Sequence, residues 1–359
     1  MSTGALLPSA ASAARPDAVQ SSLNALVLDD RMPAALASVT DREGRTRNYT
    51  AGVGDLKTGA KVPKDGQVRA GSNTKAFTAV VALQLVAEKK IALDAPVDTY
   101  LPGLLRGEGI DGRHITVRQL LQHTSGLPEY MESAVFADFP AVRYRYFEPR
   151  DLLDGALAEK AHFSPGAKWE YSNTNYLVAG LIIQKATGRP IGEEINRRII
   201  DRIGLRHTYF PTPGETTLHE PHPKGYEREA ADGPLTDYTV MDMSMAWAAG
   251  ALVSTNSDLN RFYTALLDGR LLPPAQLAQM RTTVPAEARG PGVRYGLGLT
   301  STPLSCGGVY WGHGGTALGY RTRGGVTEDG RAAGIAVTTA PTGAASQRVE
   351  AAVDTALCR

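Results

Sequence analysis

The chain has 359 residues, of which 42% are hydrophobic, so it can bury a large core in one composite domain or two contiguous domains. Its 38 basic and 37 acidic residues give a formal net charge of +1, which excludes the strongly basic surface that nucleic-acid or anionic-membrane binding requires. No apolar run approaches the roughly 18 residues of a transmembrane helix. We expect a monomer with no nucleic-acid partner and no membrane span.

The N-terminal segment, Met1 to Arg15, lacks the basic start and the apolar middle of a signal peptide, although its Ala-rich end is similar to the tail of one. Two interpretations stay open. Either the protein is secreted and its leader has been truncated, or it is cytoplasmic. We expect residues 1–20 to form a flexible segment.

The predicted elements follow from alternating apolar residues in strands and longer apolar runs in helices. In chain order they are strands at 33–40 and 47–54, a mostly helical block, strands near 294–300, 309–312, 319–327 and 331–338, and a helix at about 344–357. Strands from both chain ends predict an α+β fold with one antiparallel sheet, formed by residues 21–73 and 285–359. Residues 74–284 are then an inserted, mostly helical domain, and we expect the site in the cleft between the two.

Ser72 and Lys75 open a strongly apolar helix. Between Ala79 and Ala87 the only polar residue is Gln84, which is the pattern of a helix buried on all sides. Residues three apart share a helix face, so the hydroxyl and the amine can meet. Burial lowers the pKa of a lysine, and the helix N-terminus favours negative charge on the serine oxygen. The pattern predicts a nucleophile with its base. The alternative is a helix cap beside a solvent-directed lysine.

Two further segments carry polar groups suited to catalysis. Tyr171 and Asn173 stand ahead of a second apolar helix, where a phenol can relay protons and an amide can hold a substrate. The alternative is an ordinary helix cap with a packing tyrosine. His313 begins a glycine-rich segment in which a strand edge at Thr316 can offer a backbone N–H to an oxyanion. Its alternative is a simple turn.

Taken together, Ser72-x-x-Lys75, Tyr171-x-Asn173 and His313-x-Gly315 resemble the motif triplet of the serine beta-lactamase and penicillin-binding superfamily. The match is to its class C-like branch, with the secreted D-alanyl-D-alanine carboxypeptidases. It covers roughly residue 20 to the C-terminus. The class A motifs Ser-Asp-Asn and Lys-Thr-Gly are not found at the corresponding positions of this sequence.

The resemblance implies a role for each motif residue. Ser72 would be the acylated nucleophile, Lys75 the base, Tyr171 the proton shuttle, Asn173 a ligand of the substrate amide, His313 an electrostatic partner, and the backbone N–H groups of Ser72 and Thr316 the oxyanion hole. It also implies that no cofactor and no metal are needed, and that Cys306 and Cys358 form a disulfide. Two buried free thiols are the alternative for the cysteines.

Departures from the carboxypeptidase pattern predict altered carboxylate recognition. Thr300 and Gly314 replace an arginine and a threonine that hold the terminal carboxylate of the substrate, so charge-assisted hydrogen bonds worth about 1.5–3 kcal/mol each are lost. We therefore expect substrates that end in an ester or amide to be preferred over free acids. Arg321 and Arg323, further along the next strand, are candidates to replace the cation. The other candidate substrate-binding residues are Gly315, Leu318, Met245 and Phe136.

Other candidate sites are weak. His219 and His222 have metal-ligand spacing, but the neighbouring prolines break the helix that such a pair needs. His123 is better explained as a buried structural histidine. No Gly-x-Ser-x-Gly motif is present, which excludes an α/β-hydrolase nucleophile elbow.

The sequence therefore predicts a serine acyl-enzyme hydrolase that acts on D-amino-acid peptides, amides or esters, with a small-molecule or peptide acyl donor. An acyltransferase or cyclising enzyme of secondary metabolism, in which an amine acceptor replaces water, is the first alternative. A beta-lactamase or esterase is the second. A penicillin sensor without turnover is disfavoured because Ser72, Lys75, Tyr171 and His313 are all present.

Overall fold

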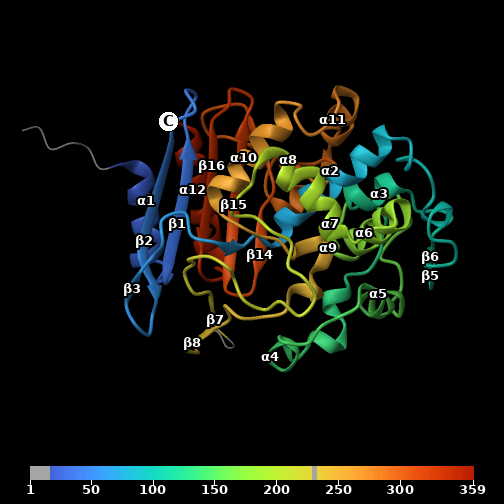
Figure 1. Ribbon diagram of the computed structural model, residues 1–359, viewed down its shortest axis with the longest axis horizontal. Coiled ribbons are helices and arrows are strands. Elements are labelled where there is room, and N and C mark those ends of the chain that lie inside the picture. The colour runs from blue at the N-terminus through green and yellow to red at the C-terminus, as the bar shows by residue number, and fades with distance from the viewer. Residues whose placement is uncertain (1–16, 229–232) are drawn as a thin grey trace, which may run out of the picture.

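The computed structural model describes residues 17–228 and 233–359, so the prediction for a leader at residues 1–15 lies outside the described residues. The strands of the main sheet come from the two ends of the sequence, which Figure 1 shows as blue and red strands side by side. The spatial order of the sheet is β10 (Val284–Pro285), β11 (Arg294–Tyr295), β12 (Thr300–Pro303), β13 (Val309–Gly312), β15 (Tyr320–Thr327), β16 (Ala332–Val337), β1 (Ala34–Thr40), β2 (Thr46–Asp55) and β3 (Ala60–Lys61), with β14 (Gly315–Ala317) also paired to β15.

All neighbouring strands of this sheet are antiparallel, and the N- and C-terminal parts of the chain meet where β1 pairs with β16, Ala35 opposite Val337. The predicted α+β fold with a sheet from both chain ends is confirmed. One predicted strand, at 294–300, is instead two short strands. A turn that contains Gly298, with a φ of +73°, separates β11 from β12.

Helices cover both faces of the sheet. α1 (Ala18–Leu28) and α12 (Gly343–Leu357) pack on one face, where Val19, Leu23 and Val353 share a core with strand residues. α10 (Asn256–Leu267) lies on the other face, against Gly334. The expectation of a flexible segment up to residue 20 is wrong for residues 18–20, since they form the first turn of α1, capped by Asp17.

The helical part is centred on α2 (Thr74–Ala87) and α6 (Thr174–Thr187), and residues 74–85 of α2 are all buried, as the all-round apolar pattern predicts. Gly180 allows α9 (Trp247–Gly250) close contact with α6, since a Cβ there would lie 2.7 Å from Trp247 and Ala248. The other helices are α3 (Val117–Gln122), α4 (Phe139–Val142), α5 (Pro149–Leu157), α7 (Ile191–Ile195), α8 (Asp201–Ile203), α9 (Trp247–Gly250) and α11 (Pro274–Met280). The remaining strands form the pairs β4 (Val68–Arg69) with β9 (Val253–Ser254), β5 (Arg106–Gly107) with β6 (Ile110–Asp111), and β7 (Tyr226–Arg228) with β8 (Leu235–Asp237).

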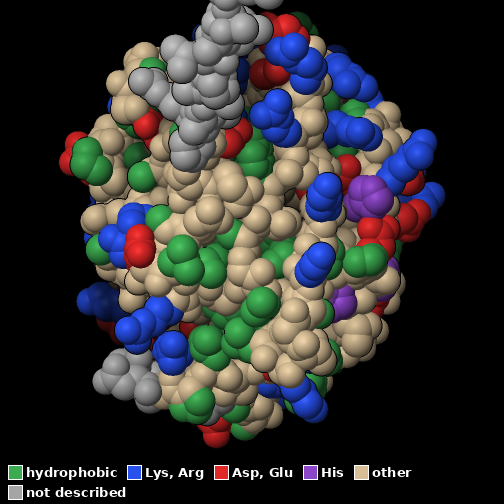
Figure 2. Space-filling model, turned by 90° about the vertical axis from the view of Figure 1, so that its left-hand side faces the viewer, with side chains coloured by type: hydrophobic (Ala, Val, Ile, Leu, Met, Phe, Trp, Pro, Cys, Tyr) green, Lys and Arg blue, Asp and Glu red, His purple; other side chains and the backbone are tan. Residues whose placement is uncertain are grey.

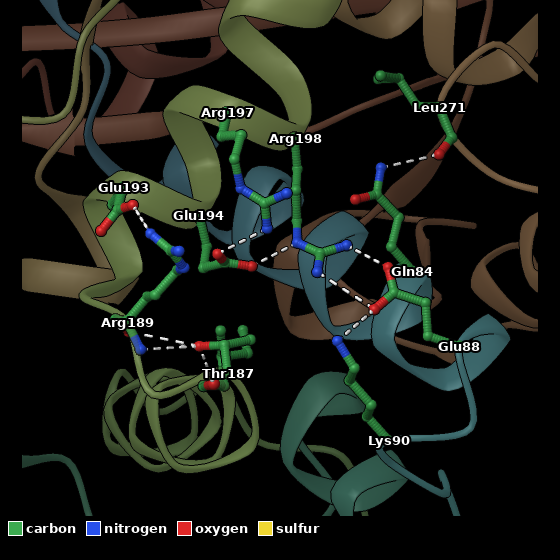
Figure 3. A network of polar contacts seen from close by, with 11 residues as sticks. Gln84, Glu88, Lys90, Thr187, Arg189, Glu193, Glu194, Arg197, Arg198 and Leu271 are labelled. Carbon is green, nitrogen blue, oxygen red and sulfur yellow. Dashed lines mark hydrogen bonds and ion pairs between the residues drawn. The ribbon is translucent and has the colours of Figure 1, made fainter.

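A network of ion pairs ties the end of α2 to the turn of π-helix at Asn196–Ile200 (Figure 3). Glu194 is fully buried and accepts hydrogen bonds from Arg197 and Arg198. Arg198 also forms an ion pair with Glu88, and this contact lowers the pKa of Glu88 to about 2. Each buried charge therefore has a partner, which offsets the cost of removing it from water.

Cys306 and Cys358 form a disulfide with their Cα atoms 5.7 Å apart, which confirms the predicted pairing and fastens the end of α12 to the segment between β12 and β13. None of the helices in the described part of the chain is long and apolar enough to cross a membrane. Figure 2 shows Lys and Arg side chains interspersed with Asp and Glu on one face of the molecule, as the near-zero net charge predicts.

Candidate active site

The nucleophile candidate lies where a short 3₁₀ turn, Gly71–Asn73, runs into α2. Ser72 is partly exposed, and its Oγ accepts a hydrogen bond of 3.0 Å from Lys75 Nζ. Gly71 has a φ of +53°, and a Cβ at this position would lie 2.7 Å from the backbone nitrogen of Thr316. The glycine therefore allows β14 to approach the turn that carries Ser72.

Lys75 is held in the interior by three acceptors. Its side chain is fully buried, and Nζ donates to Ser72 Oγ, to Asn173 Oδ1 at 2.6 Å and to the carbonyl oxygen of Ala249 at 2.8 Å. Burial lowers the pKa of Lys75, while the nearby Tyr171 opposes that shift. The environment thus favours the neutral amine, which is the form that can accept a proton from Ser72.

Tyr171 lies over the same lysine, with Nζ of Lys75 4.8 Å from its ring centroid. Two other side chains lie near the Tyr171 ring. The ring centroid of His123 is 4.3 Å and the guanidinium carbon of Arg289 is 5.2 Å from the centroid of the Tyr171 ring. The structure thus brings Ser72, Lys75 and Tyr171 together.

Asn173 connects Lys75 to an acidic residue that the sequence analysis missed. Its backbone nitrogen and its Nδ2 both donate to Glu129 Oε2, at 2.7 and 2.9 Å. Burial raises the pKa of Glu129. Both polar atoms of the Asn173 amide are therefore occupied within the protein, and a role as substrate ligand stays a prediction.

His313 lies beneath the site in a chain of buried hydrogen bonds. Its Nε2 is 2.9 Å from the hydroxyl of Tyr295, which is 3.2 Å from Nε2 of His123. Burial lowers the pKa of both histidines well below the usual range, with nearby cations adding to the effect. Both imidazoles are therefore neutral, so His313 fixes the orientation of its neighbours through hydrogen bonds and carries no positive charge. His123 is buried, as expected.

The candidate oxyanion hole lies where β14 meets the 3₁₀ turn. A Cβ on Gly315 would stand 1.8 Å from the carbonyl oxygen of Ala70, so only glycine permits this approach. Thr316 is exposed on β14 and stands next to Gly71. The assignment of the Ser72 and Thr316 backbone N–H groups to an oxyanion hole stays a prediction.

The expected absence of a cation beside Thr300 and Gly314 is wrong. The hydroxyl of Thr300 donates to the carbonyl oxygen of Gly312 at 2.8 Å, and a Cβ on Gly314 would lie 2.5 Å from Nη1 of Arg323. Arg323 and Arg289 line a small hollow with Thr300, His313 and Gly314. Arg321 is not part of this hollow and lines the wider cavity of about 880 Å³ beside it. Arg323, one of the two candidates from the sequence, and Arg289, which the sequence did not indicate, thus both reach this place.

The apolar candidates fall into two clusters. Phe136 and Met245 belong to one, together with Tyr130, and Met131 packs against it while its sulfur lies 3.7 Å from Asn173 Nδ2. That cluster therefore extends to Asn173. Leu318 packs in a different cluster that includes Met241 and Met243.

The weak metal candidates have other partners. His219 stacks on Tyr209 with ring centroids 3.9 Å apart and contacts Glu215, while His222 Nδ1 contacts the carbonyl oxygen of Glu220. Within residues 17–228 and 233–359, no group of three or more potential ligand side chains is positioned to hold a metal ion.

The fold defines the class of protein, a serine hydrolase of the beta-lactamase type. The chain belongs to the beta-lactamase family, which matches residues 17–358. In its structure it is similar to the D-stereospecific amidohydrolase from Streptomyces sp., with 42% sequence identity, a TM-score of 0.87 and coverage of 94% of this chain and 98% of that one.

Two further proteins are similar to this chain. The D-amino acid amidase from Ochrobactrum anthropi SV3, complexed with L-phenylalanine amide, is 27% identical with a TM-score of 0.81, over 94% of this chain and 96% of the other. A Bacillus subtilis penicillin-binding protein, PbpX, is 31% identical over 68% of this chain. The match spans only 55% of PbpX, about half of the length of that relative.

Proposed function

We propose that the protein hydrolyses D-amino-acid amides, esters and short peptides through an acyl-enzyme on Ser72. The observation that carries this proposal is the placement of Lys75 Nζ, buried and 3.0 Å from Ser72 Oγ, with no acidic partner among its hydrogen bonds. A neutral amine at that position can activate the serine.

The chemistry follows in two steps. Lys75 takes the proton of Ser72 as Oγ bonds to the substrate carbonyl carbon, and the carbonyl oxygen becomes an oxyanion that the backbone N–H groups of Ser72 and Thr316 bind. Collapse of this intermediate breaks the bond to the leaving group, which receives a proton through Tyr171. Water then attacks the ester, Ser72 regains its proton and the free acid leaves.

Three features support a D-amino acid as the acyl half. The similar structures include an amidohydrolase described as D-stereospecific and an amidase described as acting on D-amino acids. The apolar cluster that reaches Asn173 through Met131 suits an apolar side chain. Glu129, held beside Asn173, suits the α-ammonium group that an amino-acid amide carries next to its carbonyl.

Hydrolysis and transfer differ only in which nucleophile reaches the ester on Ser72. An amine acceptor in place of water would make the protein an acyltransferase or a cyclising enzyme, and a beta-lactam in place of the amide would make it a beta-lactamase. The test must therefore measure products as well as rates.

We would incubate the protein with D- and L-phenylalanine amide and D-phenylalanine methyl ester, with and without methylamine, and identify products by mass spectrometry. We expect the D-substrates to be hydrolysed at least tenfold faster than the L-amide. The Ser72→Ala variant should form neither product nor an adduct with a fluorophosphonate or a beta-lactam. Faster turnover of the L-amide, or labelling that persists in Ser72→Ala, would overturn the proposal, and an amide of methylamine as the main product would establish transfer.

A further inference from the structure

An arginine without a counter-ion stands at the edge of the active site. The guanidinium carbon of Arg289 lies 5.2 Å from the ring centroid of Tyr171, and within the described residues no carboxylate is close enough to pair with it. The side chain is half-buried. A cation in that setting has lost part of its hydration without gaining a partner, which favours the binding of an anion.

The backbone holds Arg289 in a compact turn. The segment between β10 and β11 is closed by a hydrogen bond of 3.0 Å from the backbone nitrogen of Ala286 to the carbonyl oxygen of Val293, and Ala286 is buried. Within it, the residues Glu287–Arg289 form a 3₁₀ turn that ends at Gly290, whose φ is +139°. Arg289 is thus presented by a closed turn, next to the strand that carries Thr300.

The acidic residues near Arg289 are engaged elsewhere or turned to solvent. Glu350, which lines both the small hollow and the wider cavity, pairs with Arg323, and Asp354 accepts hydrogen bonds from Ser305. Glu287 is exposed at the start of the turn. Arg289 therefore remains available as a binding group, while Arg323 already has a carboxylate partner.

The position of Arg289 fits the leaving group of the reaction. Tyr171 is the group that protonates the departing nitrogen, and Arg289 lies over its ring, beside the hollow formed by Thr300, His313 and Gly314. In an amino acid, the carboxylate is separated from the nitrogen by the α-carbon alone. A leaving amino acid that receives its proton from Tyr171 would thus direct its carboxylate toward Arg289.

We infer that Arg289 binds the free carboxylate of a leaving amino acid, so that peptides ending in an acid are favoured substrates. This inference rests on the proposed function and names the leaving half of its substrates. It reverses the preference for esters and amides that the sequence predicts, since the cation missing at Thr300 is supplied by a different segment. The wider cavity of about 880 Å³, which Arg289 also lines, leaves room for the side chain of that amino acid.

The test compares D-Phe-D-Ala with D-Phe-D-Ala amide, which share the acyl half and the broken bond and differ in the terminal charge. We expect the unmodified enzyme to show a kcat/KM about tenfold higher for the acid, expressed mainly in KM. Arg289→Gln should lose this advantage, so that its kcat/KM values for the acid and for the amide become about equal, and Arg289→Lys should retain part of it. Arg294→Gln is the matched control, since Arg294 is exposed and bonded to Thr283 outside this cavity.

Three outcomes would overturn the inference: no preference for the acid in the unmodified enzyme, an unchanged preference in Arg289→Gln, or an equal fall for acid and amide. The last would mean that Arg289 acts on Tyr171 and not on substrate. Melting temperatures show whether the variants fold, and Arg289→Lys replaces Arg289→Gln if the latter does not. If the unmodified enzyme turns over no D-substrate, the proposed function fails. Calorimetric binding of the two dipeptides to Ser72→Ala, with and without Arg289→Gln, then decides the inference about Arg289 separately.

Discussion

Glu129 accepts two hydrogen bonds from Asn173 through one oxygen atom, 2.7 Å from the backbone nitrogen and 2.9 Å from Nδ2. This contact fixes the amide of Asn173 with its oxygen toward Lys75 Nζ, 2.6 Å away. An acidic residue thus acts on the base through an intervening amide, without a direct ion pair that would keep the lysine protonated.

Glu129→Gln tests whether this carboxylate also binds the α-ammonium group of the substrate. We expect KM for D-phenylalanine amide to rise about tenfold or more, because a charge-assisted hydrogen bond is lost. The matched measurement uses N-acetyl-D-phenylalanine amide, which has no ammonium group and should be affected far less. An equal rise for both substrates would show that Glu129 only positions Asn173.

Lys75→Ala and Tyr171→Phe should each slow acylation by about 10²–10⁴-fold while the fold stays intact, since proton transfer contributes on that order. Rates of adduct formation with a beta-lactam, followed by intact-mass spectrometry, provide the measurement, and circular dichroism checks the fold. Near-native rates in both variants would mean that another base serves Ser72.

The pH dependence of acylation should reflect the burial of Lys75. The neutral amine is the active form, so the rate rises with pH as the lysine loses its proton and then levels off. Because burial lowers the pKa of Lys75, the midpoint of this rise should lie below 10.5, the value of an ordinary lysine. A midpoint at or above that value, in a rate profile for a substrate that does not titrate, would contradict the assignment.

We expect Gly315→Ala and Gly314→Ala to differ in how strongly they impair acylation. The new Cβ at Gly315 would stand 1.8 Å from a backbone oxygen, which cannot move without separating β14 from Ser72. At Gly314 the contact is with the end of the Arg323 side chain, which can turn away. We expect Gly315→Ala to abolish acylation and Gly314→Ala to retain it. Comparable activity of the two variants would contradict the close approach of β14.

The Cys306–Cys358 disulfide should resist alkylation, in native and in denatured protein, until a reductant is added. Cys358→Ser should lower the free energy of unfolding by about 2–4 kcal/mol, measured by denaturant titration without reductant. Both thiols reacting readily in oxidised protein would contradict the pairing.

Local sequence predicts those parts of the site whose partners are near in the chain. Ser72 and Lys75 lie three residues apart, in the 3₁₀ turn before α2 and in the first turn of α2, so local helical geometry places them together. Glu129 and Arg289 were missed because each lies in an irregular segment, where tertiary packing decides which way a side chain points. α1 has apolar residues at 19, 23 and 26, which are typical of a helix, but it follows an Ala-rich segment that obscured the pattern.

The contact of β14 with the turn before α2 brings Thr316 next to the turn that carries Ser72, although the two residues lie far apart in the chain. Ser72 lies in the turn that directly precedes the buried helix α2, whereas Thr316 lies on β14, which joins the main sheet through its pairing with β15. A refolding chain whose helices are already buried should therefore remain inactive until the sheet closes. Recovery of Ser72 reactivity would then report on completion of the sheet, later than recovery of helical signal.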